Sequence, residues 1–194
     1  MRDTLIPLLL AGVIWLLPGS LAAQLDAAIP DAGVTAGTLS FDGHATVGDF
    51  TGTTSEVRGE LAGGPGLPAV RGWVEAPVRS LETGNGKRDK DLNKSMESDK
   101  YPVIRFELGG VTHQGGTADS ASLMLAGKLS LHGVTRDVSF PAQVRAVAGG
   151  LRLRCDFPLD LSDYEIGGLS KMLGMLKMSE DIEVHVDLTF GPRG

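Results

Sequence analysis

The sequence predicts an all-β fold of about seven or eight antiparallel strands. Along most of the chain apolar residues alternate with polar ones, which is the pattern of strands with one buried and one solvated face. The 27 glycines and 10 prolines suit many short strands and turns, and both residue types disfavour helices. Closing such a sheet would remove its exposed edges, but the alternation alone fits a barrel and a two-sheet sandwich equally well.

The chain begins with a predicted secretory signal peptide, residues 1–22. Arg2 supplies a positive charge, an apolar run of about 13 residues follows, and the small residues Ser20 and Ala22 precede the expected cleavage site. The apolar run is too short to span a bilayer, which takes about 20 residues. An uncleaved anchor is the alternative, because Asp3 weakens the positive region. Cleavage near Ala22 would place the mature protein in the periplasm or outside the cell.

The mature chain is expected to form one domain after a flexible leader, residues 23–37, which are rich in Ala, Pro, Asp and Gly and lack a period. About 170 residues can fold without disulfide bonds, and the single cysteine, Cys155, cannot form one within the chain. The net charge of -6, without a basic stripe, argues against nucleic acid as a partner and against charge-driven adhesion to membranes. No other long apolar run exists, so we expect no stable membrane insertion.

The first four predicted strands cover residues 39–41, 57–61, 70–78 and 104–108. In the second and third, apolar residues and glycines occupy one phase and charged residues the other. The Gly63–Gly66 stretch separates these two strands. Between the third and the fourth, the turn Thr83-Gly84-Asn85 leads into a charged segment, which we expect to form a short exposed helix over residues 88–98.

The last four predicted strands cover residues 123–131, 138–144, 151–161 and 182–190. His132-Gly133 is expected to form the hairpin turn between the first two of them, and Gly149-Gly150 separates the next pair. Earlier in the chain, Gly109-Gly110 and Gly115-Gly116 are interpreted as loops.

A helix inside an otherwise all-strand pattern is unusual, and the residues around it are specific. The relevant stretches are Ser80–Leu92, Lys100–Phe106 and Gly127–Arg136. They resemble the YceI-like family, and the resemblance extends from about Thr38 to Phe190. It implies a single antiparallel, lipocalin-like β-barrel of about eight strands over residues 38–191, with one short helix after the turn. Characterised members hold a long apolar chain, typically a polyisoprenoid. The resemblance therefore implies that the partner is an apolar lipid and that there is no other cofactor. It also allows a homodimer.

The residues that would line such a barrel follow from the inward phase of the strands. The predicted lining residues are Phe41, Val74, Phe106, Leu129, Leu131, Phe140, Phe157, Met172, Met175 and Val186. Glycines in the same phase, Gly59, Gly72 and Gly127, would leave volume among them. In the alternative, a barrel packed solid, these glycines only permit curvature. Residues 169–178 carry Met and Leu at helical spacing, and we expect a short helix that lines or covers the mouth of the cavity, although such a stripe is more often core.

A polar head group would need contacts of its own, and the candidates are Asn85 and Arg88. Together with Thr83, Gly84 and Asp89 they match the family's motif position by position. The functional interpretation is that Arg88, with the Asn85 side chain, meets a phosphate or another polar group. The structural interpretation, which the residue types favour, is a turn at Gly84-Asn85 followed by local capping or pairing.

No catalytic or metal-binding constellation is evident in the sequence. The four histidines lack the spacing of metal ligands, no Gly-x-Ser-x-Gly motif supports an esterase, and Cys155 falls in the apolar phase, where a thiol is inert. Trp73 departs from the pattern because it shares the outward phase with Arg71 and Glu75. Its position indicates a bulge, an exposed partner patch or, as we favour, packing beneath the leader or the helix.

These observations predict a non-enzymatic, periplasmic or secreted carrier of an apolar chain, and the resemblance to the YceI-like family implies that this chain is a polyisoprenoid held for transport or storage. A fatty acid or fatty amide is the alternative ligand, because apolar walls discriminate weakly between chains. A different class of function is a stress-related interaction module whose barrel is filled by its own side chains. An enzyme acting on a lipid is a third, for which no residue set can be named.

Overall fold

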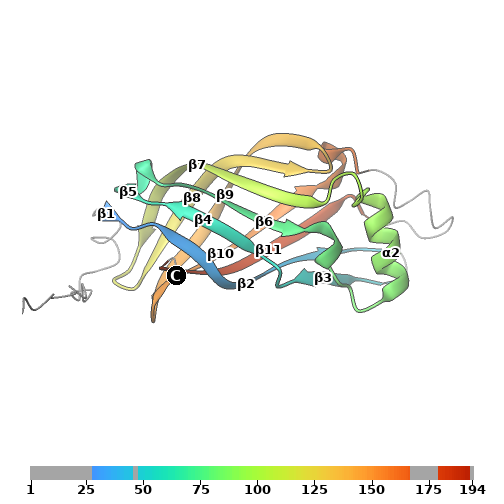
Figure 1. The fold of residues 1–194 in the computed structure, drawn as a ribbon, viewed down its shortest axis with the longest axis horizontal. Helices are drawn as coiled ribbons and strands as arrows, with labels where there is room; N and C mark the ends of the chain where they lie inside the picture. Colours follow the sequence, from blue (N-terminus) through green and yellow to red (C-terminus); the bar gives the residue numbers. More distant parts are fainter. Residues whose placement is uncertain (1–27, 46–47, 167–178, 193–194) are drawn as a thin grey trace, which may run out of the picture.

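The computed structural model describes residues 28–45, 48–166 and 179–192. They form a closed, eight-stranded antiparallel barrel with one short α-helix, which confirms the predicted fold (Figure 1). Going round the barrel, the strands are β2 (Ala32–Gly43), β4 (Arg58–Ala62), β6 (Arg71–Pro77), β7 (Val103–Gly116), β8 (Ser120–Leu131), β9 (Val134–Val147), β10 (Gly150–Asp160) and β11 (Asp181–Gly191). Pairing of β11 with β2 closes the barrel, so no long sheet edge is left open.

A ninth strand, β3 (Phe50–Thr54), continues the line of β4. Both strands pair with the same edge of β2, β3 through Leu39↔Thr54 and β4 through Gly33↔Glu60, and both keep one register. β3 and β4 are therefore two parts of one interrupted strand. The alternation did not indicate β3, because Phe50 is its single large apolar residue.

The barrel begins at residue 32, whereas we expected residues 23–37 to be a flexible leader. Residues 32–37 form the first half of β2 and pair with β11, for example Gly37 with Leu188. Glycine and alanine hide the alternation in this segment, and the pairing with a distant strand orders it. A Cβ at Gly37 would meet the Leu188 side chain and the Asp187 carbonyl, so a glycine here allows the close approach of the two strands. Further upstream, β1 (Ala28–Ile29) pairs with β5 (Gly64–Pro65).

The interpretation of Gly109-Gly110 and Gly115-Gly116 as loops was wrong. Both pairs lie within β7, whose register against β8 shifts between Leu108 and Gly110 and again between His113 and Gly115. Shifts of this kind mark β-bulges, which bend a strand without ending it. The predicted hairpin turn is confirmed, since His132 (φ 52°) and Gly133 (φ 79°) connect β8 to β9 with positive φ values.

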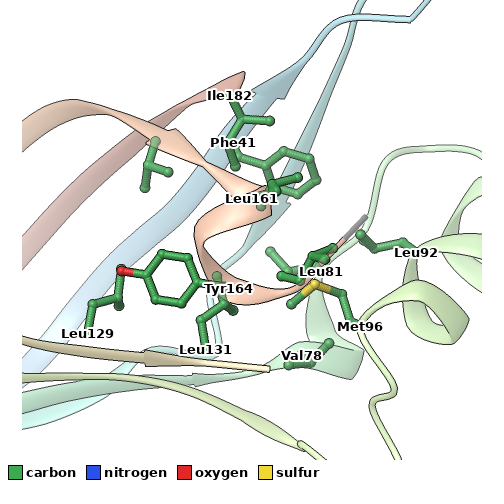
Figure 2. Close-up of a cluster of buried hydrophobic side chains, with 12 residues drawn as sticks. Phe41, Val78, Leu81, Leu92, Met96, Leu129, Leu131, Leu161, Tyr164 and Ile182 are labelled. Atoms are coloured by element: carbon green, nitrogen blue, oxygen red, sulfur yellow. The ribbon is translucent and has the colours of Figure 1, made fainter. Parts of the chain in front are cut away.

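The predicted helix is α2 (Gly86–Ser95), which begins two residues earlier and ends three residues sooner than expected. Figure 1 shows α2 across one end of the barrel, with the short β1–β5 pair at the other end. Lys87, Lys90 and Lys94 are exposed. Leu92 and the following Met96 are buried against the barrel interior (Figure 2). The helix therefore covers the barrel end rather than lying free on the surface.

The described residues also form three 3₁₀ helices: η1 (Leu67–Ala69), η2 (Val78–Ser80) and η3 (Leu161–Tyr164). Buried apolar residues form two clusters inside the barrel. The α2-end cluster includes Leu92, Leu161 and Tyr164, and the second cluster surrounds Leu125 and Ala142. Between the clusters lie partly buried side chains that contact both: Phe106, Val138, Phe157 and Val186. The interior is thus densely packed in two regions and looser between them.

Candidate lipid-binding cavity

A cavity of about 230 Å³ runs through the barrel interior. Its walls reach from Leu67 and Val70, near η1, to Leu92 and Met96 at the α2 end, and every strand of the closed barrel contributes residues to them. The lining residues are almost all aliphatic or aromatic; Ser40 and Glu75 are the polar or charged exceptions that the described residues contribute. Since an apolar cavity of about 150 Å³ can stay dry and bind benzene, this one can hold an apolar ligand.

Incomplete burial of inward-facing side chains shows that the barrel is not packed solid. On β10, Leu151, Leu153, Phe157 and Leu159 face the interior with the buried Cys155, yet each of these four retains accessible surface. On β11, Val186 is partly exposed between the buried Val184 and Leu188. Apolar side chains in a filled core would lose this surface.

Eight of the predicted lining residues lie on the cavity wall: Phe41, Val74, Phe106, Leu129, Leu131, Phe140, Phe157 and Val186. Met172 and Met175, with the short helix expected over residues 169–178, lie outside the described residues. Whether the wall residues contact a ligand stays a prediction. The wall also includes residues that the sequence analysis did not single out. Leu151 and Leu153 could have been found from their inward phase on the strand, and Ile166 follows η3.

The inward glycines do not enlarge the cavity, contrary to expectation. A Cβ at Gly59, Gly72 or Gly127 would meet a carbonyl oxygen and a side chain of the neighbouring strand. For Gly127 the contacts are the Glu107 carbonyl and the Phe106 ring. These glycines therefore serve the close approach of strands, and the cavity arises from the spacing of larger side chains.

Asn85 and Arg88, the head-group candidates, are not among the residues that line the cavity. The Asn85 Oδ1 accepts hydrogen bonds from the backbone N–H groups of Lys87 (3.0 Å) and Arg88 (3.2 Å), which caps α2. The Arg88 guanidinium lies 4.2 Å from the Phe50 ring centroid. Asp89 accepts from the N–H and hydroxyl of Thr83. The motif thus has structural roles, and a head-group role for it stays untested.

Two buried polar groups border the interior. Burial raises the pKa of the Cys155 thiol to about 12, which keeps it protonated and unreactive at neutral pH. Tyr164 is 1% exposed, and its hydroxyl has no hydrogen-bond partner among the residues that the structure describes. In Figure 2 this hydroxyl points away from α2, towards Leu129.

Contacts on the outer face of the barrel explain why Trp73 occupies an outward position. Its strand shows no register shift against β4 or β7, so a bulge is not the cause. The ring lies beneath the Arg105 guanidinium, 4.6 Å from the ring centroid. Arg105 also pairs with Glu75 (2.6 Å), whose side chain is only 12% exposed, and Glu75 accepts from Arg58 (2.7 Å). Trp73 is therefore covered by an ion-pair network. Its packing beneath the leader or the helix, which we favoured, stays a prediction.

A second polar cluster on the outer face surrounds His185. Its Nδ1 lies 2.6 Å from Asp156 and its Nε2 lies 3.1 Å from Asp42. Hydrogen bonds to Asp156 and then to Asp42 raise the pKa of His185. Across residues 28–45, 48–166 and 179–192, no three His, Cys, Asp or Glu side chains are placed to hold a metal ion. No helix in these ranges is long and apolar enough to cross a membrane.

Solved structures share this architecture at low sequence identity. BcnA of Burkholderia cenocepacia has a TM-score of 0.68 and 15% identity, covering 79% of this chain and 95% of that one. A polyisoprenoid-binding domain from Saccharophagus degradans, implicated in plant cell wall breakdown, has a TM-score of 0.68 and 17% identity, covering 84% and 98%. A YceI protein of Campylobacter jejuni has a TM-score of 0.56 and 17% identity, covering 78% and 85%. These similarities establish the fold.

No curated protein matches the sequence. The model of the YceI-like domain, however, matches residues 32–190, which span all eight barrel strands and α2. The chain belongs to the YceI-like family.

Proposed function

We propose that this protein is a non-enzymatic carrier that holds a polyisoprenoid, or a similarly long apolar chain, inside its barrel. The observation that carries the proposal is the cavity of about 230 Å³, whose apolar wall side chains retain accessible surface. The polyisoprenoid-binding domain of Saccharophagus degradans, which has the same fold, supports this choice of ligand.

The energetics of such a site need no reactive group. Burying a hydrocarbon chain gains about 0.8 kcal/mol per CH₂, so a dozen buried carbons can offset the free energy that association costs. The Cys155 sulfur, which lies on the wall, is held as the thiol. Apolar walls also select weakly between chains of equal length, so a fatty acid or fatty amide is the ligand to compare.

We further propose that the protein works in the periplasm or outside the cell. The support is the sequence of residues 1–22, which has the charge, apolar run and small residues of a signal peptide cleaved near Ala22.

Native mass spectrometry of the mature protein purified from its own periplasm tests the ligand, followed by organic extraction and lipid identification. We expect one prenyl or acyl species per barrel. Leu153→Trp, which fills the cavity from β10, should abolish this species. Thr112→Trp on the exposed face of β7 is the matched control and should retain it. A barrel that is empty and also refuses added prenyl and fatty-acyl lipids would overturn the proposal.

A further inference from the structure

The barrel wall is split between β9 and β10. Their ladder has five pairs, from Gly150↔Val147 to Arg154↔Gln143, and then stops. Beyond this point β9 continues along β8 to Val134, and β10 continues along β11 to Asp160. Each strand has a proline in the unpaired part, at position 141 in β9 and 158 in β10. Proline lacks the N–H that a ladder needs, so the local sequence favours this split.

Side chains close the split. On the cavity side, Phe140 of β9 and Phe157 of β10 stack face to face, with centroids 4.4 Å apart and planes 8° apart. At the far end, Arg136 of β9 donates from Nε to the Asp163 carbonyl of η3 (2.5 Å). Arg136 also forms an ion pair with the Asp163 carboxylate (3.2 Å). This part of the wall is therefore held by two rings and by the contacts of Arg136 rather than by a ladder between β9 and β10, and these side chains can move apart without breaking strand pairing.

On the outer surface, a depression of about 470 Å³ lies where the ladder stops. Arg145, Arg152 and Arg154 line it, and the pairing register places Arg145 directly opposite Arg152. Like charges in that position are destabilising. Asp187 accepts from both Arg152 (2.6 Å) and Arg154 (2.8 Å), whereas Arg145 has no partner within the described part of the chain.

The acidic groups around this depression do not neutralise its three arginines. Asp156 also lines it, but one of its carboxylate oxygens accepts from His185. A cluster of three arginines stands out in a chain of net charge -6. An anion between Arg145 and Arg152 would relieve their repulsion, and guanidinium groups on neighbouring strands suit the several oxygens of a phosphate.

We propose that this depression binds the phosphate or pyrophosphate head group of a prenyl lipid whose chain passes between β9 and β10 into the cavity. Val144 and Cys155 line both the depression and the cavity, so a single layer of wall separates the two spaces. Phe140 and Phe157 would part to admit the chain. The inference rests on the proposed lipid-carrier function and adds the head-group chemistry and the route.

The test compares two ligands with the same chain, geranylgeranyl pyrophosphate and geranylgeraniol, and inorganic pyrophosphate without a chain. We expect wild-type protein to bind the pyrophosphate lipid at least tenfold more tightly than the alcohol. Arg145→Gln should reduce this ratio about tenfold, because it removes one charge-assisted contact. Lys90→Gln removes the same charge from the exposed face of α2 and should leave the ratio unchanged. Isothermal titration calorimetry measures all three.

The outcomes separate this inference from the carrier function. Equal affinity for both lipids in wild-type protein, or equal ratios in Arg145→Gln and Lys90→Gln, would overturn the head-group site and leave the carrier function standing. Binding of inorganic pyrophosphate as tight as that of the lipid would show a free-anion site and overturn the lipid assignment. Failure of both lipids to bind would overturn the carrier function itself. Phe157→Leu, which removes the ring stack, should speed association of the lipid several-fold, and an unchanged rate would overturn the route.

Discussion

The cavity predicts unequal costs in unfolding free energy for the same substitution at two facing positions. Leu153 of β10 and Leu188 of β11 are directly paired, point inward and both line the cavity. Leu188 is 1% exposed, whereas Leu153 is only partly buried. Truncation to alanine at each position removes the same atoms from the same sheet, so the pair isolates the effect of the space beside Leu153.

The expected magnitudes follow from burial. A Leu→Ala substitution costs the lost transfer free energy plus a term for the new cavity, together about 2–5 kcal/mol in a packed core. For Leu188, which is fully enclosed, we expect about 3–4 kcal/mol. Leu153 keeps part of its surface accessible, so its truncation should cost less, about 1–2 kcal/mol.

Urea unfolding of the lipid-free mature protein measures both costs through the fluorescence of Trp73, the one tryptophan after residue 22. Equal m-values in both variants are the control that the unfolded states are comparable. Saturating lipid should raise the cost of Leu153→Ala towards that of Leu188→Ala, because the lipid supplies the missing contacts. Equal costs in the lipid-free protein would refute the reasoning, since they would mean that Leu153 lies in a filled core.

Three further predictions concern local chemistry. Asn85→Ala should lower the free energy of unfolding by about 1 kcal/mol through loss of the α2 cap; an unchanged urea midpoint would contradict this. Cys155, whose pKa burial raises to about 12, should resist iodoacetamide at about pH 8 until urea unfolds the protein; rapid alkylation of folded protein would show an open wall. The raised pKa of His185 means that its stabilisation is complete below the unfolded pKa of about 6.5 and fades as pH rises through the folded value. The urea midpoint of wild-type protein should therefore be higher than that of His185→Gln at about pH 5, and the two midpoints should be equal by about pH 9.

The period-two alternation was sufficient to predict the barrel strands that contain large apolar residues. It could not reveal β3 or the first half of β2, because glycine, threonine and alanine give these segments little contrast between faces. Pairing with residues far along the chain orders them, as Gly37 with Leu188 shows. The glycine pairs of β7 were wrongly predicted to be loops for a related reason, because a β-bulge and a loop have the same local composition.

The candidate site was predictable in its wall but not in its volume. Alternation determines which side chains face inward, so eight predicted residues lie on the wall. Whether facing side chains meet across the barrel depends on distances between strands, which no local pattern contains. The same holds for the arginine depression. Arg152 and Arg154 are outward residues of one strand, and only the register of β9 against β10 brings Arg145 opposite Arg152.

Under the proposed carrier function, the cavity would also link ligand binding to stability. The α2-end cluster and the second cluster bury their apolar residues with the chain's own side chains, whereas the residues between them, such as Phe157 and Val186, do not complete their contacts. A bound lipid would fill this middle region and act as a missing part of the core. A ligand that binds only the folded protein adds about 2.7 kcal/mol at a free concentration of 100 times its Kd. That gain is comparable to the free energy of unfolding that is lost when one buried leucine is truncated to alanine. The lipid-bound and lipid-free proteins should therefore differ measurably in stability while sharing one fold.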